Sequence, residues 1–120
     1  MTESAIHQVI RTYFESMHES SAAKVHEVFH PSAKIAGYLE GEFTEMSVEQ
    51  FANLVAGIDP SPKAAGAEEV LEVVSLEIAG KTAVARVRDA YLGSMFLDTL
   101  AFIEVDGRWF IYNKLFHVES

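Results

Sequence analysis

The chain has 120 residues, of which 49% are apolar and 22% charged, and its formal net charge is −9. This size and composition are typical of one folded globular domain, here residues 1–120. The negative charge argues against a nucleic-acid partner, because such binding needs Lys and Arg to neutralise phosphates. The absence of cysteine excludes disulfides and thiol chemistry.

No run of about 18 apolar residues is present to span a bilayer. The first residues, MTESAIHQ, lack the basic and apolar regions of a signal peptide. We therefore expect a cytoplasmic protein without a membrane partner. The sequence contains neither a glycine-rich phosphate loop nor a G-x-S-x-G elbow, so no cofactor is expected.

The N-terminal half predicts helices. The first helix has a single apolar stripe with spacings of three and four residues. That stripe consists of Ile6, Val9, Ile10, Tyr13, Phe14 and Met17. A short second helix follows Ser20-Ser21 and ends before Pro31, since the residue before a proline is pushed out of the helical region.

A third helix is predicted further along the chain. Ser47 and Gln50 form a capping box at its start, and Gly57 stops it. Its buried side is Val48, Phe51, Leu54 and Val55. The segment 33–46, with Gly41 near its middle, predicts a short strand pair, and the segment 58–66 is a loop.

Residues 26–30 spell HEVFH, which on a helix would place two imidazoles on one face for zinc, with Glu27 as a base. Pro31 follows directly, so His26 and His30 need not share a helical face. No downstream segment supplies a convincing third ligand. We therefore expect no metal site.

The C-terminal half predicts four antiparallel strands joined by two-residue turns. Asp106-Gly107 between apolar runs is typical of a type I′ hairpin, which sets Val105 opposite Arg108. Gly93-Ser94 and Gly80-Lys81 each have Gly first, as a type II′ turn requires. Helices followed by strands predict an α+β fold in which three N-terminal helices cover one face of a strongly curved antiparallel sheet.

These registers place a largely apolar set of side chains on one face. The set is Val74, Leu76, Ile78, Ala83, Ala85, Val87, Asp89, Tyr91, Phe96, Asp98, Leu100, Phe102, Glu104, Trp109, Ile111, Asn113, Leu115 and His117. Asp89 would lie directly across from Asp98, with His117 diagonally beside Asp98. Two opposed carboxylates on an apolar face are costly unless they share a proton or a cation.

The cluster of Asp89, Asp98 and His117 has two interpretations. In one, Asp89, Asp98 and His117 form a small-molecule pocket with acid–base potential. In the other, they are solvated residues at the wet end of the sheet. Trp109 is either core packing or a ligand-stacking residue. Asn113 either satisfies a backbone group or contacts a ligand.

The opposite face of the sheet is too apolar to face water. It carries Leu71, Val73, Leu97, Ala101, Ile103, Phe110, Tyr112 and Phe116. We expect this face to form a two-fold homodimer. The alternative is that the N-terminal segments wrap around it.

Three segments carry a family resemblance: FHPSAKI, GKTAVARVR and DTLAFIEVDGRWFIYNKLFH. With the order of elements, they resemble the nuclear-transport-factor-two-like superfamily, in its small bacterial branch labelled "putative lumazine-binding". The resemblance implies a cone-shaped, cystatin-like α+β barrel that is usually dimeric. The superfamily mixes enzymes with proteins of no known catalysis, so the fold does not settle function.

Two functions remain open. The first is a small-molecule-binding protein without catalysis, whose apolar cone uses Tyr38, Tyr91, Phe96, Trp109 and Asn113 to hold a ligand. The second is a lyase or isomerase of the SnoaL or ketosteroid-isomerase kind. In that enzyme one carboxylate, Asp98 or Asp89, would remove a proton from carbon while His117 or a tyrosine stabilises the oxyanion.

Overall fold

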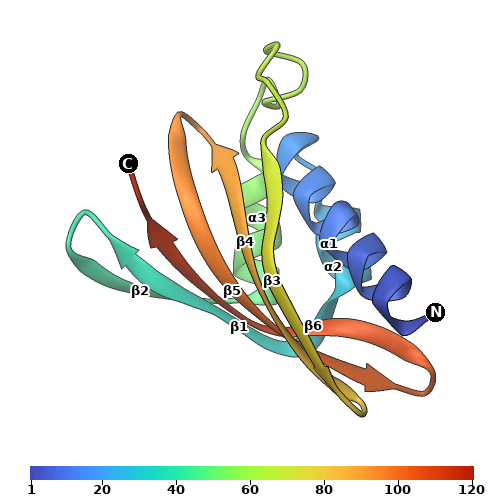
Figure 1. Cartoon of the computed structure of the whole chain (residues 1–120). Helices are drawn as coiled ribbons and strands as arrows, with labels where there is room; N and C mark the ends of the chain where they lie inside the picture. The colour runs from blue at the N-terminus through green and yellow to red at the C-terminus, as the bar shows by residue number, and fades with distance from the viewer.

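The computed structural model describes residues 1–120. Its elements are α1 (Thr2–His18), α2 (Ala22–Val28), β1 (Phe29–Leu39), β2 (Glu42–Ser47), α3 (Val48–Ala56), β3 (Leu71–Ala79), β4 (Thr82–Tyr91), β5 (Ser94–Val105) and β6 (Arg108–Val118). The strands form one sheet in the order β2-β1-β6-β5-β4-β3. All three helices lie on one side of this curved sheet (Figure 1). The α+β prediction is confirmed.

The sheet differs from the prediction in two respects. β1 begins at Phe29 and pairs with β6 in parallel, so the sheet is mixed and not purely antiparallel. β2 and β3 are free edges at opposite ends, so the sheet is not closed into a barrel. Local turn signals did not reveal the parallel pairing, because it joins segments about eighty positions apart in the sequence.

The helices begin and end close to the predicted residues. In α1, the apolar stripe is buried except for the half-buried Val9. Ser47 and Gln50 form the predicted capping box, at 3.2 Å and 2.9 Å. In α3, however, Ala52 is buried and Leu54 is 50% exposed. None of the three helices has the length and apolar character needed to cross a membrane.

Two of the three hairpin turns are as predicted. Val105 pairs with Arg108 across Asp106-Gly107, whose φ values of 52° and 79° are those of a type I′ turn. Ala79 pairs with Thr82 across Gly80-Lys81.

The third turn is shifted. Its loop residues are Leu92 and Gly93, with φ values of 51° and 83°, so Tyr91 pairs with Ser94. A positive φ is rare for Leu, which is why the sequence favoured Gly93 as the first loop residue. The register of β4 against β5 therefore moves by two residues. A two-residue shift keeps every side chain on its predicted face.

A β-bulge in β6 overturns part of the predicted face. Pairing holds from Val105–Arg108 to Phe102–Ile111, but Ala101 then pairs with Asn113, which leaves Tyr112 as an extra residue. Beyond the bulge every side chain changes face. Lys114 and Phe116 are therefore buried on the inner side.

The bulge turns three side chains predicted on the inner face to the outside: Asn113, Leu115 and His117. A second bulge, in β3, leaves Val74, also predicted inside, as an extra residue that is 45% exposed. Leu71 and Val73 were predicted on the outer face, but beyond this bulge they pack against the core. On the inner side, Gly37 of β1 makes room for the turned-in Phe116. A Cβ at Gly37 would lie 2.5 Å from the Phe116 carbonyl oxygen.

The outer face of the sheet has no helix over it (Figure 1). We define it by the β4, β5 and β6 side chains that alternate with the buried set: Val84, Arg86, Arg88, Leu97, Thr99, Ala101, Ile103, Asn113, Leu115 and His117. Val84 is 45% exposed and Leu115 is 56% exposed. The alternative that the N-terminal segments wrap around this face is wrong, because α1 and α2 pack on the inner side.

Candidate functional site

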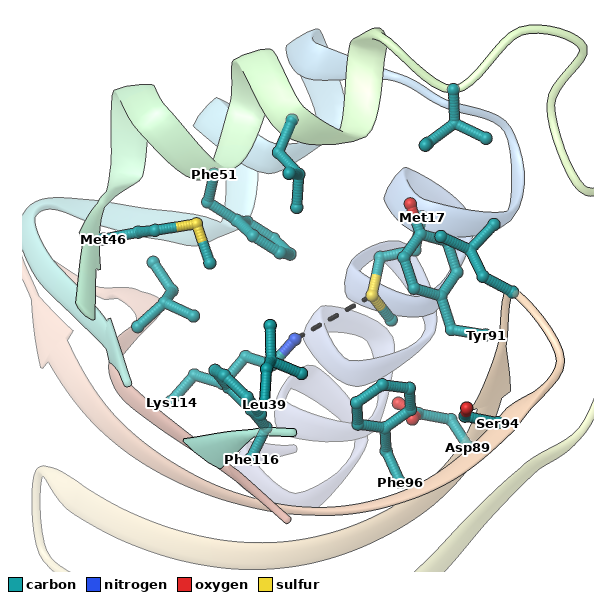
Figure 2. A pocket seen from close by; sticks show the side chains of 14 residues that line it. Met17, Leu39, Met46, Phe51, Asp89, Tyr91, Ser94, Phe96, Lys114 and Phe116 are labelled. Atoms are coloured by element: carbon teal, nitrogen blue, oxygen red, sulfur yellow. Dashed lines mark hydrogen bonds between the residues drawn. The ribbon is translucent and has the colours of Figure 1, made fainter. Parts of the chain in front are cut away.

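A cavity of about 270 Å³ lies between α1, α3, β1 and the concave face of the sheet. Figure 2 shows its lining side chains converging from these elements. The wall is largely apolar: Met17, Ile35, Leu39, Met46, Phe51, Leu54, Ile58, Leu92, Phe96 and Phe116. Its polar side chains are Asp89, Tyr91, Ser94 and Lys114. An apolar hollow with a few convergent polar groups is typical of a small-molecule site.

Asp89 and Asp98 point to this inner side from neighbouring strands. Asp89 pairs with Phe96 and Asp98 pairs with Val87, so the carboxylates are diagonal neighbours and not directly opposed as predicted. Both residues are only 1% exposed. The two-residue register shift brought this change about and left both aspartates on the same face.

Most of the carboxylate oxygens of the pair have no partner. Asp98 Oδ2 accepts a 2.6 Å hydrogen bond from the Tyr13 hydroxyl. Asp98 Oδ1 and both Asp89 oxygens are buried without a hydrogen bond. Burial, reinforced by the charge of Asp98, raises the pKa of Asp89 to about 9. The pair therefore holds a proton at neutral pH.

Tyr13 fixes one end of this pair. Its ring is fully buried in α1, and burial with the two nearby carboxylates raises the pKa of its hydroxyl well above the ordinary value. The hydroxyl stays protonated and acts as a donor. It therefore orients Asp98 and leaves Asp89 free at the cavity wall.

Lys114 brings an amine into the same cavity. Its side chain is 5% exposed, and Nζ lies 4.9 Å from the centroid of the Tyr13 ring and 4.6 Å from that of Phe51. Its one hydrogen-bond contact is with the Met17 sulfur, at 3.9 Å (Figure 2). Nζ thus has no oxygen acceptor. The sequence analysis missed Lys114, because only the bulge at Tyr112 turns it inward.

Tyr91 adds a further unpartnered group. Its hydroxyl is buried without a hydrogen bond, and burial raises the pKa of Tyr91 to about 12. Tyr91 follows Asp89 by two residues on β4, so both side chains lie on one face. Phe96 pairs with Asp89 across the strands and also lines the cavity.

The structure separates the predicted site residues into two groups. Asp89, Tyr91 and Phe96 line the cavity, and Asp98 lies on the same inner face behind its wall, diagonally beside Asp89. His117 and Asn113 lie on the outer face, because the bulge reverses their direction. The predicted proton-transfer role of His117 and the ligand contact of Asn113 therefore do not fit this cavity.

Two predicted ligand-binding aromatics also lie away from the cavity. Tyr38 is 64% exposed and packs against Phe43 across the β1–β2 pair, with ring centroids 5.9 Å apart. Trp109 is buried in the hydrophobic core and does not line the cavity, which agrees with its core-packing alternative.

The HEVFH segment does not form one helical face. His26 is in the last turn of α2, whereas His30 is in β1, where its ring lies 5.1 Å from that of Tyr112. No group of three or more His, Cys, Asp or Glu side chains in the structure is arranged to hold a metal ion.

Comparisons with known proteins agree with this architecture. The family described as "Putative lumazine-binding" matches residues 1–117. A curated protein from Cladobotryum sp, named Aldolase FrzH, is 31% identical over 98% of this chain and 94% of its own length.

Solved structures show the same fold. An NTF2-like protein of unknown function from Silicibacter pomeroyi DSS-3 covers 98% of this chain and 96% of its own, with 22% identity and a TM-score of 0.90. Another from Shewanella baltica OS155 covers 99% and 94%, with 22% identity and a TM-score of 0.86. The resemblance stated from the sequence is confirmed: this chain belongs to the "putative lumazine-binding" family and has the NTF2-like fold.

Proposed function

We propose that this protein is a carbon–carbon lyase that makes or breaks an aldol bond in a small, largely apolar carbonyl compound. The observation that carries the proposal is the buried Asp89–Asp98 pair, in which Asp89, with both oxygens unpartnered, lines an apolar cavity. The aldolase name of a relative with 31% identity supports the same reaction class. The lyase expected from the sequence is retained, but without His117.

The chemistry requires a base that removes a proton from the carbon next to a carbonyl. The raised pKa of Asp89 makes its ionised form a stronger base than a solvated carboxylate, and Asp89 is ionised when the proton of the pair lies on Asp98. Asp89 lines the cavity, so we assign it the contact with substrate. Asp98, held by Tyr13, shares the proton of the pair and is a positioning residue.

The negative charge that develops on the carbonyl oxygen also needs a donor. The Tyr91 hydroxyl is unpartnered and its raised pKa keeps it protonated, so it can donate a hydrogen bond to that oxygen. In the bond-forming direction, the proton that Asp89 removes from carbon returns to the new alkoxide. Atoms and charge therefore balance without an added co-reactant.

The second candidate is a binding protein without catalysis. The predominance of apolar side chains in the cavity wall and the name of the family favour it. Such a protein would hold a ligand in the same cavity, with Asp89 and Tyr91 as hydrogen-bonding groups. The two candidates differ in whether a bound carbonyl compound exchanges its α-protons.

The test measures exchange of the α-protons of cyclohexanone for deuterium in D₂O by NMR. We expect Asp89→Asn, which removes the proposed base, to slow the protein-catalysed exchange about 100-fold to 10,000-fold, the usual contribution of acid–base catalysis. Asp106→Asn is the matched control, because the same chemical change falls on an exposed turn residue. Cyclohexanone that binds in the cavity, seen by chemical-shift changes, without catalysed exchange would contradict the lyase and support the binding protein.

A further inference from the structure

We propose that Lys114 is a catalytic nucleophile that condenses with the carbonyl group of the substrate to form a covalent iminium. This inference rests on the proposed lyase function and specifies how the carbonyl compound is held. It is carried by two features of Lys114, its direction and its surroundings.

The direction of Lys114 is set by the bulge. Without the extra residue Tyr112, Asn113 would point into the cavity and Lys114 would point outward. Bulges are over-represented next to active sites, where they re-aim a side chain. Here the re-aimed side chain is an amine that reaches the apolar cavity wall.

The surroundings of Nζ suit a covalent role better than a structural one. A buried lysine that contributes to stability normally has a carboxylate or carbonyl oxygen as a partner. Lys114 has only two aromatic rings and the Met17 sulfur. Amines in apolar pockets are a known form of activated nucleophile.

The Tyr13 and Phe51 rings stabilise the positive charge at Nζ both before and after the iminium forms. The ammonium becomes an iminium when the carbonyl oxygen leaves as water with two of the ammonium protons, so the positive charge at Nζ is unchanged. The faces of the Tyr13 and Phe51 rings, which stabilise the ammonium, therefore stabilise the iminium as well. No redox partner is needed.

The carboxylates complete the sequence of steps. The pair takes a proton from the ammonium so that the amine can attack, then returns it to the carbinolamine oxygen. Asp89 next removes the α-proton, which gives a neutral enamine. The enamine carbon forms the new bond to the acceptor aldehyde, whose oxygen takes up the proton. Because the donor carbonyl oxygen has already left as water, the Tyr91 hydroxyl donates to this aldehyde oxygen in the iminium route. Water then releases the product and restores the ammonium.

The experiment traps the iminium in the intact protein. Wild-type protein is incubated with cyclohexanone and sodium cyanoborohydride, and peptides are analysed by mass spectrometry. We expect a cyclohexyl group on Lys114 at least about tenfold faster than on Lys34, an exposed lysine of β1 that serves as the internal control.

A pair of variants separates covalent from electrostatic roles. Lys114→Arg keeps the charge but cannot form an iminium, so we expect α-proton exchange to fall at least about 100-fold. Lys34→Arg should retain wild-type exchange. The trapping result comes from wild-type protein and is therefore independent of how well Lys114→Arg folds.

The outcomes distinguish this inference from the proposed function. If Lys114 is labelled no faster than Lys34, or if Lys114→Arg exchanges normally, the iminium is excluded. Exchange that still depends on Asp89 would then leave the lyase in place. Labelling of Lys114 without any catalysed exchange would instead retain the covalent site and overturn the lyase.

Discussion

Two adjacent residues of β4, Arg88 and Asp89, show opposite ways of accommodating a charge. Arg88 lies on the outer face, where Nε is 2.8 Å from a Glu119 oxygen and Nη1 is 3.0 Å from a Glu72 oxygen. Asp89 points to the inner face and has no hydrogen-bond partner for either oxygen. The surface guanidinium is fully paired, whereas the buried carboxyl is not.

This difference indicates that the paired Arg88 contributes to the stability of the fold, whereas the unpaired Asp89 does not. Leaving a buried polar group unpaired costs about 1–3 kcal/mol. Asp89, Tyr91 and Asp98 all bear this kind of cost at one cavity. Retaining three such groups together is expected where a ligand supplies the missing partners.

The largest effect is expected for Asp89→Asn, which removes the titration of the buried carboxyl. With a pKa of about 9 in the folded protein and about 3.9 unfolded, Asp89 takes up a proton on folding at pH values between these two. The native state then binds more protons than the unfolded state. Its free energy of unfolding should fall as pH rises from about 4 to about 9, by up to about 1.4 kcal/mol per pH unit.

Urea denaturation between pH 5 and pH 8 measures this effect. We expect Asp89→Asn to flatten the pH dependence and to gain stability relative to wild type as pH rises. Asp106→Asn, at an exposed turn, should leave the wild-type curve unchanged. Parallel curves for wild type and Asp89→Asn would show that Asp89 titrates like a solvated carboxyl.

Where sequence reasoning succeeded, the information was local. The Ser47–Gln50 capping box and the Asp106-Gly107 turn each involve residues within four positions of one another, so a short pattern contains the whole signal. Asp89 and Asp98 were also correctly assigned to one face. Side chains alternate along each strand, so a register error of two residues leaves every side chain on the same face of the sheet.

The predictions from the sequence that were wrong concern features that depend on contacts between residues distant in the sequence. No residue in β6 marks the bulge at Tyr112: the segment has neither Gly nor Pro. The bulge accompanies the parallel pairing with β1, where Gly37 admits Phe116. Lys114 was consequently missed, and His117 and Asn113 were placed on the wrong face.

A smaller effect is expected for a substitution on the outer face. Its exposed apolar side chains, with Leu115 near the centre of the sheet, lead us to propose that two copies associate through it. We expect Leu115→Asp to shift the protein from dimer to monomer in sedimentation velocity.

Leu92→Asp is the control for this shift. Leu92 is 57% exposed, but it lies in the β4–β5 turn at the cavity. The Leu92→Asp variant should therefore leave the dimer unchanged. A wild-type protein that is monomeric at every concentration tested would exclude the dimer.

The smallest effect is expected for Arg88→Gln. Exposed ion pairs contribute little to stability because water and salt screen them. Hydrogen bonds from Arg88 lower the pKa of Glu119, so their contribution is present above the unfolded pKa of Glu, about 4.3, and is lost as pH falls. This dependence is opposite in sign to that of Asp89.

Arg88→Gln should therefore differ slightly from wild type at pH 7, converge with it in acid, and lose the difference in high salt. The steeper decline with rising pH should remain, because Asp89 is still present. Urea denaturation of Arg88→Gln, Asp89→Asn and the double variant tests whether the two effects add. Additive changes in the free energy of unfolding would show that Arg88 and Asp89, on opposite faces of one strand, act independently. Strong coupling between the two substitutions would mean that the surface ion pair helps to hold the buried carboxyl in place.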